Sequence, residues 1–278
     1  MLKNKVGVLL GFHAGVDIKA SFQKAVDMDL ECCQLIIWDA VNHTDENAEL
    51  IKKASQETGI EITALWAGWT GPCAWNFYDG PATLGLVPQS YRMMRLKELM
   101  SASDFAYKLG VTDIITHCGY IPEDPHHPDF IGVVSALKYL CNYLGARGQY
   151  FLFETGQETP VTLLRTIEEV GTGNLGINLD TANLILYGKA STVDALDVFG
   201  KYVRNTHCKD GFYPTTGREL GHEVPLGQGK ANFPGVIKKL AELGYKGPYV
   251  VEREISGEQQ HKDIAMARDF IRSLLSEL

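Results

Sequence analysis

The chain has 278 residues, of which 45% are hydrophobic, and a formal net charge of −8 at pH 7. This length can bury one large core, and the acidic balance excludes a nucleic-acid backbone as the expected main partner, because phosphates bind basic surfaces. Six cysteines without Cys-x-x-Cys spacing are interpreted as reduced thiols of a cytoplasmic protein. No apolar run approaches the roughly 20 residues that span a bilayer, so no membrane partner is expected.

Short apolar runs alternate with amphipathic helical patterns along the whole chain. Runs typical of buried strands occupy residues 5–12, 32–38, 61–69, 111–120, 149–155, 174–183, 201–211 and 247–254. Helices are predicted between and after them, at 20–30, 46–59, 90–110, 129–148, 160–171, 191–200, 232–244 and 261–278. This repetition, in a chain near the ~250 residues typical of the fold, predicts a (β/α)8 TIM barrel that forms a single domain over 1–278.

Two features bear on this prediction. An open doubly wound sheet is the alternative, and the absence of a glycine-rich phosphate loop after the first strand argues against it. The segment at 70–88 is rich in glycine, proline and aromatic residues and is too long for a plain connection, so we expect a functional loop there. Trp66, Trp69, Trp75 and Phe77 flank or lie in this loop and are interpreted as a wall of a ligand pocket, or as packing for the loop or an oligomer interface.

Metal-competent side chains occur at the ends of the last four predicted strands, where the chemistry of a TIM barrel lies. These residues are Glu154, Asp180, His207 and Glu252. Three carboxylates and one imidazole suit a divalent ion such as Mn²⁺ better than they suit a closed structural zinc site. Taken singly, each residue could be a helix cap or a polar loop residue, so the prediction depends on their equivalent positions.

The stretch NTHCKDG follows the seventh predicted strand. Along an extended chain, Lys209 shares a face with His207, whereas Cys208 points the opposite way, into the layer between barrel and helices. Asp210 is expected to orient Lys209 or to cap the next turn. The glycine-rich turn LGQGKANF is interpreted as shaping the start of the next helix rather than as a phosphate site.

Four stretches, FLFETGQE, GINLDTAN, NTHCKDG and VPLGQGKANFPGVIKKLAELGYKGPYVVERE, resemble the xylose-isomerase-like TIM-barrel superfamily, specifically its sugar (phosphate) isomerase/epimerase members. The resemblance implies that Glu154, Asp180, His207 and Glu252 bind one divalent metal ion. Mn²⁺ is the first choice, with Mg²⁺, Co²⁺ or Zn²⁺ as alternatives. It also implies that Glu154 and Glu252 act as an opposed acid/base pair on a proton next to a sugar carbonyl, through a metal-stabilised enediolate.

The expected substrate contacts are His117, Asn183, Lys209, Trp66 and Glu158. The chain departs from the pattern of the family's ketose 3-epimerases, which have a histidine where Asn183 stands and often an arginine where Tyr213 stands. Their second glutamate falls on Pro160, although Glu158 is close in sequence. A sugar isomerase or epimerase is therefore the leading hypothesis. The alternative is a metal-dependent lyase or dehydratase that uses the same site on 3-oxo-sugars or glycosides.

Two further alternatives carry less weight. An apurinic-endonuclease-like role would need a histidine-rich metal cluster, but Asn183 stands at one expected histidine and Glu223 lies near another expected ligand position. The acidic net charge also disfavours binding of DNA. A non-catalytic sugar-binding barrel is disfavoured by the complete set of ligand-type residues. The expected partner is thus a small-molecule sugar, and a homo-oligomer is left open.

Overall fold

The computed structural model describes residues 4–278. Eight parallel strands close into a barrel in the order β1, β10, β7, β6, β5, β4, β3, β2. The strands are β1 Val6–Gly11, β2 Cys32–Ile37, β3 Glu61–Ala67, β4 Asp113–Thr116, β5 Tyr150–Glu154, β6 Leu175–Asp180, β7 Val203–Cys208 and β10 Tyr249–Val251. Each lies within a run predicted from sequence, so the (β/α)8 TIM-barrel prediction is confirmed.

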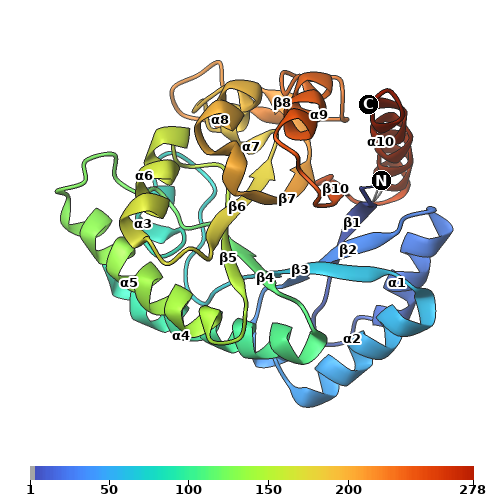
Figure 1. Ribbon diagram of the computed structural model, residues 1–278, viewed down its shortest axis with the longest axis horizontal. Helices are drawn as coiled ribbons and strands as arrows, with labels where there is room; N and C mark the ends of the chain where they lie inside the picture. The colour runs from blue at the N-terminus through green and yellow to red at the C-terminus, as the bar shows by residue number, and fades with distance from the viewer. Residues whose placement is uncertain (1–3) are drawn as a thin grey trace.

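The helices form an outer ring around the strands (Figure 1). The longer ones are α1 Ile18–Asp27, α2 Asp45–Thr58, α4 Gln89–Leu109, α5 Pro128–Gly145, α6 Pro160–Val170, α8 Thr192–Phe199, α9 Phe233–Glu242 and α10 Glu258–Ser276. Short helices are α3 Gly80–Thr83 and α7 Asn183–Leu186, with 3₁₀ turns at Ala40–Asn42 and Gly200–Tyr202. Among residues 4–278, no helix combines the length and apolar character that crossing a membrane requires.

The helix ends follow local sequence signals. The Thr44 side chain accepts a hydrogen bond from the Asn47 N–H at the start of α2. Gly59 ends that helix in the left-handed region, at φ 75°, which glycine adopts without the strain of a side chain. These signals fix where each helix stops, and therefore where the chain turns back into the barrel.

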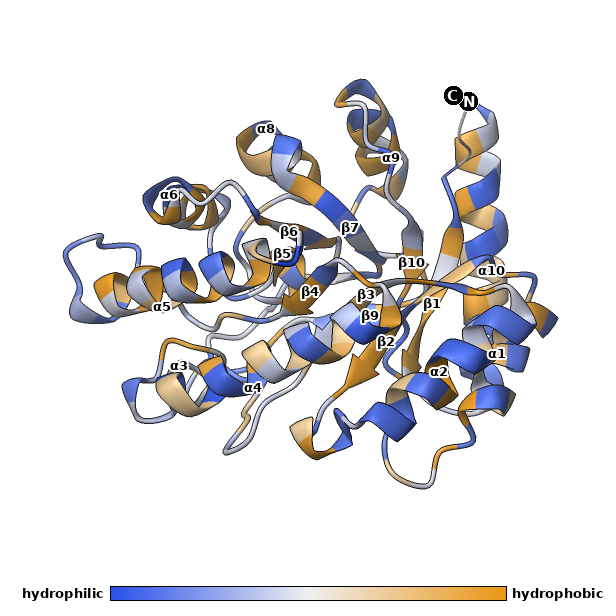
Figure 2. Cartoon of the chain, turned by 60° about the horizontal axis from the view of Figure 1, so that its bottom comes forward, coloured by the Kyte–Doolittle hydropathy of each residue, from blue (hydrophilic) through white to orange (hydrophobic). Residues whose placement is uncertain are grey.

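The main apolar core lies between the strands and the surrounding helices. Figure 2 shows hydrophobic strands inside helices whose outer faces are largely hydrophilic. Cys208 is fully buried in this core, as its alternation with His207 predicts. Inside the barrel the filling is partly polar, because Gln34 on β2 hydrogen-bonds to Asn178 on β6 and Asn205 on β7.

The segment between β7 and α9 adds a small hairpin to the barrel. An antiparallel hairpin of β8 Asp210–Phe212 and β9 His222–Val224 lies within the segment between β7 and α9. The strand register brings Asp180 opposite His207, and Glu154 opposite Asn178. The polar residues at the carboxyl ends of β5, β6, β7 and β10 are thereby placed at one common level.

Candidate active site

The four ligand-type residues predicted at consecutive strand ends lie together. Ligand atoms of Glu154, Asp180, His207 and Glu252 all lie within 4.8 Å of one another. His207 Nδ1 is 3.0 Å from Glu154 Oε1, 3.0 Å from Glu252 Oε2 and 3.8 Å from Asp180 Oδ2. We call these four residues the carboxylate cluster.

Gln34 fixes the orientation of the His207 ring from inside the barrel. Its amide nitrogen donates to Asn178 Oδ1 at 3.0 Å and Asn205 Oδ1 at 2.8 Å, so its oxygen faces His207 Nε2 at 2.6 Å. Because an amide oxygen can only accept, Nε2 carries the proton and Nδ1 is free to face the carboxylates. Metal-binding imidazoles are typically held in this way through their second nitrogen.

Gln34 is not among the residues predicted from sequence. The signal that could have found it is its position as a single polar residue inside the apolar run CCQLIIW. Within a barrel strand such a residue has to face either the helix layer, where polar groups rarely find partners, or the barrel interior.

The carboxylate cluster has the properties of a cation site. Asp180 is fully buried, its Oδ1 accepts from the N–H groups of Ala182 and Asn183, and within residues 4–278 its Oδ2 has no hydrogen-bond partner. Burial raises the pKa of Asp180 well above its usual value; the charge of Lys209 opposes this, and the neighbouring glutamates add to it. Since an unpaired buried carboxylate oxygen is costly, these residues fit, and could hold, a divalent metal ion.

Glu154 is held by four side chains. Trp66 Nε1 donates to its Oε2, while its Oε1 lies 3.0 Å from His207 Nδ1, 3.4 Å from His117 Nε2 and 3.4 Å from Asn183 Nδ2. Burial alone would raise the pKa of Glu154, but His117 and His207 hold it well below its usual value. Three predicted substrate contacts, Trp66, His117 and Asn183, thus surround this carboxylate.

Glu252 follows β10 and is less enclosed, with 13% of its side chain exposed. Burial alone would raise the pKa of Glu252, but the charges of Lys209 and His207 lower it to about 2. Both glutamates of the cluster are therefore ionised at neutral pH and available as proton acceptors.

Lys209 is buried beside the cluster, with 1% of its surface exposed. Its Nζ pairs with Glu254 and lies 3.5 Å from Asn183 Oδ1, 3.6 Å from Glu252 Oε1 and 3.8 Å from Asp180 Oδ2. Burial alone would lower the pKa of the Lys209 ammonium, but the three carboxylates raise it well above its usual value. Lys209 therefore stays charged, and Glu254 is its close partner.

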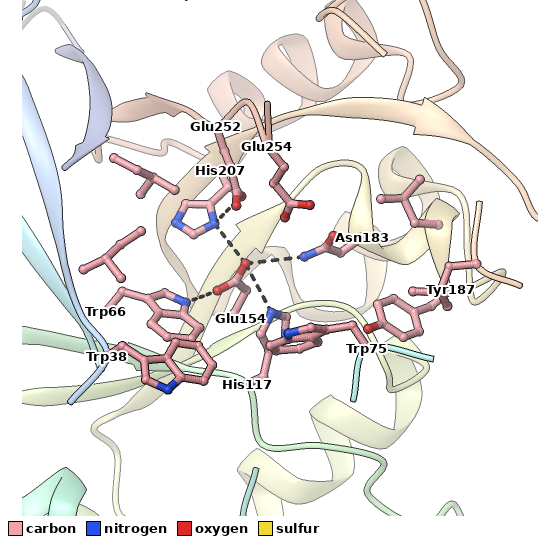
Figure 3. Close-up of a pocket in the computed structure, with 14 residues that line it drawn as sticks. Trp38, Trp66, Trp75, His117, Glu154, Asn183, Tyr187, His207, Glu252 and Glu254 are labelled. Carbon is pink, nitrogen blue, oxygen red and sulfur yellow. Dashed lines mark hydrogen bonds and ion pairs between the residues drawn. The ribbon is translucent and has the colours of Figure 1, made fainter. Parts of the chain in front are cut away.

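A cavity of about 380 Å³ opens above the cluster. Figure 3 shows Glu154 between His207 and His117, with Trp66 and Trp38 stacked on one side and Trp75 and Tyr187 on another. Residues that line this pocket but were not expected there from sequence include Trp38, Tyr187 and Glu254, whereas Trp75, interpreted as a possible pocket wall, does line it. Trp75 belongs to the loop that was expected to be functional, whereas Trp38 carried no signal beyond following a strand.

Glu158 has a different environment. It is buried, and within the described part of the chain neither carboxylate oxygen has a hydrogen-bond partner. Burial raises the pKa of Glu158 to about 8. It does not line the 380 Å³ cavity, so its contact with substrate stays a prediction.

Asp210 organises the glycine-rich turn before α9. Its carboxylate accepts hydrogen bonds of 2.9–3.0 Å from the N–H groups of Gly211, Gly227, Gly229 and Ala231. A Cβ on Gly229 would lie 2.2 Å from Asp210 Oδ1, so this position needs glycine. Of the two predicted roles for Asp210, capping the turn is the one the structure shows. These N–H groups are paired within the chain and are not left for a phosphate.

Comparisons with known proteins agree with this architecture. A family model described as xylose isomerase-like TIM barrel matches residues 22–274. An uncharacterised protein of Methanocaldococcus jannaschii is 25% identical over 183 residues; the match covers 59% of this chain and only 58% of that protein.

Solved structures match over almost the full chain. A xylose isomerase domain protein from Planctomyces limnophilus has a TM-score of 0.92 and 34% identity, with 99% of this chain and 98% of that chain covered. A 3-keto-D-glucoside 4-epimerase from E. coli has a TM-score of 0.72 and 17% identity, covering 98% and 100%. A xylose isomerase-like TIM barrel protein from Mycobacterium smegmatis, in complex with magnesium, has a TM-score of 0.74 and 17% identity, covering 99% and 97%. The two structures at 17% identity share the fold, whereas the family model and the Planctomyces structure establish kinship. The chain belongs to the xylose isomerase-like TIM-barrel family.

Proposed function

We propose that the protein is a divalent-metal-dependent sugar isomerase or epimerase that moves a proton at the carbon next to a carbonyl. The observation that carries this proposal is the pair Glu154 and Glu252. They come from strands β5 and β10, which β6 and β7 separate, and they approach His207 Nδ1 from two sides of one pocket (Figure 3). Two ionised carboxylates on opposite sides of a bound sugar can act as base and acid in turn.

The parts played by the residues follow from their contacts. Glu154, Asp180, His207 and Glu252 would hold the metal ion, which when bound polarises the sugar carbonyl and stabilises negative charge on its oxygen. Glu154 takes the proton from the neighbouring carbon, and the electron pair of that C–H bond passes toward the carbonyl oxygen. Lys209 and Asn183, 3.5 Å apart, are placed to bind sugar oxygens. Return of a proton to the same carbon from the Glu252 carboxyl, which first takes that proton from solvent, gives the epimer; return of a proton to the former carbonyl carbon, while the hydroxyl proton of the first carbon passes to the former carbonyl oxygen, gives the isomer.

Elimination from a 3-oxo-glycoside is the second candidate. After Glu154 removes the proton from carbon 2, the electron pair forms a double bond to carbon 1 and the bond to the glycosidic oxygen breaks. The leaving alcohol then takes up a proton, so that atoms and charge balance without an oxidant. Two observations favour this outcome: Asn183 stands where the ketose 3-epimerase pattern has a histidine, and two partly exposed tryptophans, Trp38 and Trp75, line the pocket. Solved structures of similar fold include both a 3-keto-D-glucoside 4-epimerase and a D-psicose 3-epimerase, so the fold is compatible with either candidate.

Solvent exchange tests the proposal. The Mn²⁺-loaded protein is incubated in D₂O with a panel of ketoses and 3-oxo-glycosides, and deuterium next to the carbonyl is followed by NMR. We expect exchange with at least one panel member, and a decrease of about 10²- to 10⁴-fold in Glu154→Gln and Glu252→Gln. Glu49→Gln, an exposed carboxylate on α2, is the matched control. Exchange that survives in both site variants would overturn the proposal, and release of the aglycone would identify the lyase.

A further inference from the structure

All four tryptophans of the chain belong to one group of neighbouring rings, and three of them, Trp38, Trp66 and Trp75, line the pocket. The Trp38 ring stacks on Trp66 with centroids 5.5 Å apart and an interplanar angle of 22°. Trp69 lies 5.3 Å from Trp38 and 6.1 Å from Trp75. These residues come from the end of β2, the end of β3 and the loop that follows β3, so the fold assembles them from separate segments.

The four rings differ in exposure. Trp66 and Trp69 are 7% and 3% exposed, whereas Trp38 and Trp75 are each 41% exposed and both line the pocket. An indole buries about 150–250 Å² when it is fully packed, so each outer ring leaves a large apolar area at the opening of a polar site. Exposed aromatic surface contiguous with a ligand pocket is typical of a binding surface.

The exposed rings of Trp38 and Trp75, the outer rings, do not contact Glu154 directly; one side chain lies between each of them and this carboxylate. Trp38 packs on Trp66, whose Nε1 donates to Glu154. Trp75 packs edge-on against His117, with centroids 5.0 Å apart, and His117 Nε2 is 3.4 Å from Glu154. A sugar ring that presents its carbon to Glu154 would lie against Trp66 and His117, which leaves the exposed faces of Trp38 and Trp75 for a further group.

The outer rings are held rigidly. Arg95 is 1% exposed, and its guanidinium donates to the backbone carbonyls of Thr70, Pro72, Thr83 and Gly85, at 2.7–3.2 Å. A buried cation is thus used to fix the loop that carries Trp75.

Trp38 is held by a close backbone approach. A Cβ on Gly68 would lie 2.5 Å from the Trp38 carbonyl oxygen and 2.7 Å from its indole Cδ2, so glycine is needed at the end of β3. Rings that are already fixed lose little conformational freedom when a flat ligand stacks on them.

We propose that Trp38 and Trp75 form a second binding position, the mouth subsite, which takes a second ring joined to the reacting sugar through its glycosidic oxygen. The inference rests on the proposed function, because it places the reacting sugar over the carboxylate cluster. The ligand class is a cyclic glycoside, and the second ring is a pyranose or an aryl group that stacks one apolar face on an indole. A free monosaccharide occupies only the floor of the pocket.

Equilibrium binding tests this inference without turnover. Calorimetry on the Mn²⁺-loaded protein compares methyl β-D-glucoside, cellobiose and phenyl β-D-glucoside, none of which carries the keto group that the reaction needs. We expect cellobiose, phenyl glucoside or both to bind about 3- to 10-fold more tightly than methyl glucoside, the range expected for one aromatic stack. Preference for cellobiose identifies a pyranose, and preference for phenyl glucoside identifies an aryl group.

Substitutions of the two tryptophans test whether the preference for a second ring arises at the mouth subsite. Trp38→Ala and Trp75→Ala are expected to lower the affinity for cellobiose or phenyl glucoside more than the affinity for methyl glucoside, so that the preference is lost, and Trp75→Phe is expected to retain part of it. Tyr107→Ala, an aromatic residue on α4 that is 61% exposed and does not line the pocket, should bind all three ligands like wild type.

Three outcomes overturn the mouth subsite: equal affinity for all three ligands, no measurable binding, or equal loss of methyl glucoside binding in the tryptophan variants. A protein that shows the ring preference but no solvent exchange would refute the proposed function alone. Exchange with simple ketoses and no ring preference would refute the mouth subsite alone.

Discussion

The floor and the mouth of the pocket are built in different ways. The floor consists of residues at the ends of barrel strands, where register fixes their positions and Glu154, Asp180 and His207 are at most 3% exposed. The mouth consists of Trp38 and Trp75, which follow strands, lie in irregular segments and are 41% exposed. Charge placement depends on the barrel itself, while the surface that selects a ligand depends on loops that can vary without disturbing the barrel.

The largest effect is expected from the floor. Asp180→Asn replaces an oxygen that has no hydrogen-bond partner within residues 4–278 and that the proposed metal would bind. We expect metal affinity to fall by more than the 10- to 100-fold that supporting residues typically cost. The increase in melting temperature that Mn²⁺ gives the wild-type protein should disappear. Calorimetric titration and thermal unfolding measure both effects, and an unchanged metal stoichiometry would contradict the ligand role.

Gln34 tests how far the floor extends into the barrel. Gln34→Leu removes the acceptor for His207 Nε2–H, so the imidazole no longer presents Nδ1 in a fixed orientation. We expect metal affinity to fall about 10- to 100-fold, with partial recovery in Gln34→Glu, which restores an acceptor. A role in packing alone would give equal metal affinity in the two variants, whatever their melting temperatures.

Arg95 tests whether mouth and floor are separable. Arg95→Lys keeps the charge but cannot reach four carbonyls at once, so buried acceptors lose partners and the free energy of unfolding falls by about 2–3 kcal/mol. Ring preference in glycoside binding should weaken, whereas metal affinity should stay at the wild-type value. Urea unfolding and calorimetry check these expectations, and a parallel loss of metal affinity would show that the two regions are coupled.

The smallest effect is expected from Glu158, which belongs to neither the floor nor the mouth of the pocket. This effect concerns the pH dependence of the free energy of unfolding. Burial raises the pKa of Glu158 to about 8, so the folded protein keeps this proton at pH values where the unfolded chain has lost it. The stability contribution is fully present below the unfolded pKa and is lost as pH rises toward 8. Wild type should therefore lose roughly 1–3 kcal/mol of unfolding free energy, relative to Glu158→Gln, between pH 5 and 8. Identical pH dependence in urea unfolding would contradict this environment.

The same contrast explains what the sequence could predict. The alternation of strand and helix patterns identifies the barrel, and since parallel strands end at one rim, the strand-end residues Glu154, Asp180, His207 and Glu252 could be placed together without coordinates. Gln34 was within reach, because a lone polar residue in a buried strand needs partners inside the barrel. The position of Trp38 at the pocket could not be predicted from sequence. The direction of a side chain just after a strand is set by tertiary packing, here by Trp66 and Gly68.

Two residues show the limit of reasoning from neighbours in sequence. Glu158 was expected at the substrate because it lies near a glutamate position of related enzymes; it is buried and does not line the 380 Å³ pocket, so this contact stays a prediction. Asp210 was expected to orient Lys209 or to cap the next turn; it caps the turn, and the close partner of Lys209 is Glu254, contributed by the chain after β10. This ion pair joins the ends of β7 and β10, which are neighbours in the barrel but distant in sequence, so local spacing does not reveal it.

Asp210 also takes the part of a bound anion at the rim of the barrel. In many proteins a ring of backbone N–H groups at a glycine-rich turn folds around an incoming anion. In this chain four such groups already close around the Asp210 carboxylate, which therefore acts as a tethered anion. The chain therefore supplies from its own side chain the charge that holds the segment leading into α9, and this turn needs no bound anion to satisfy its N–H groups.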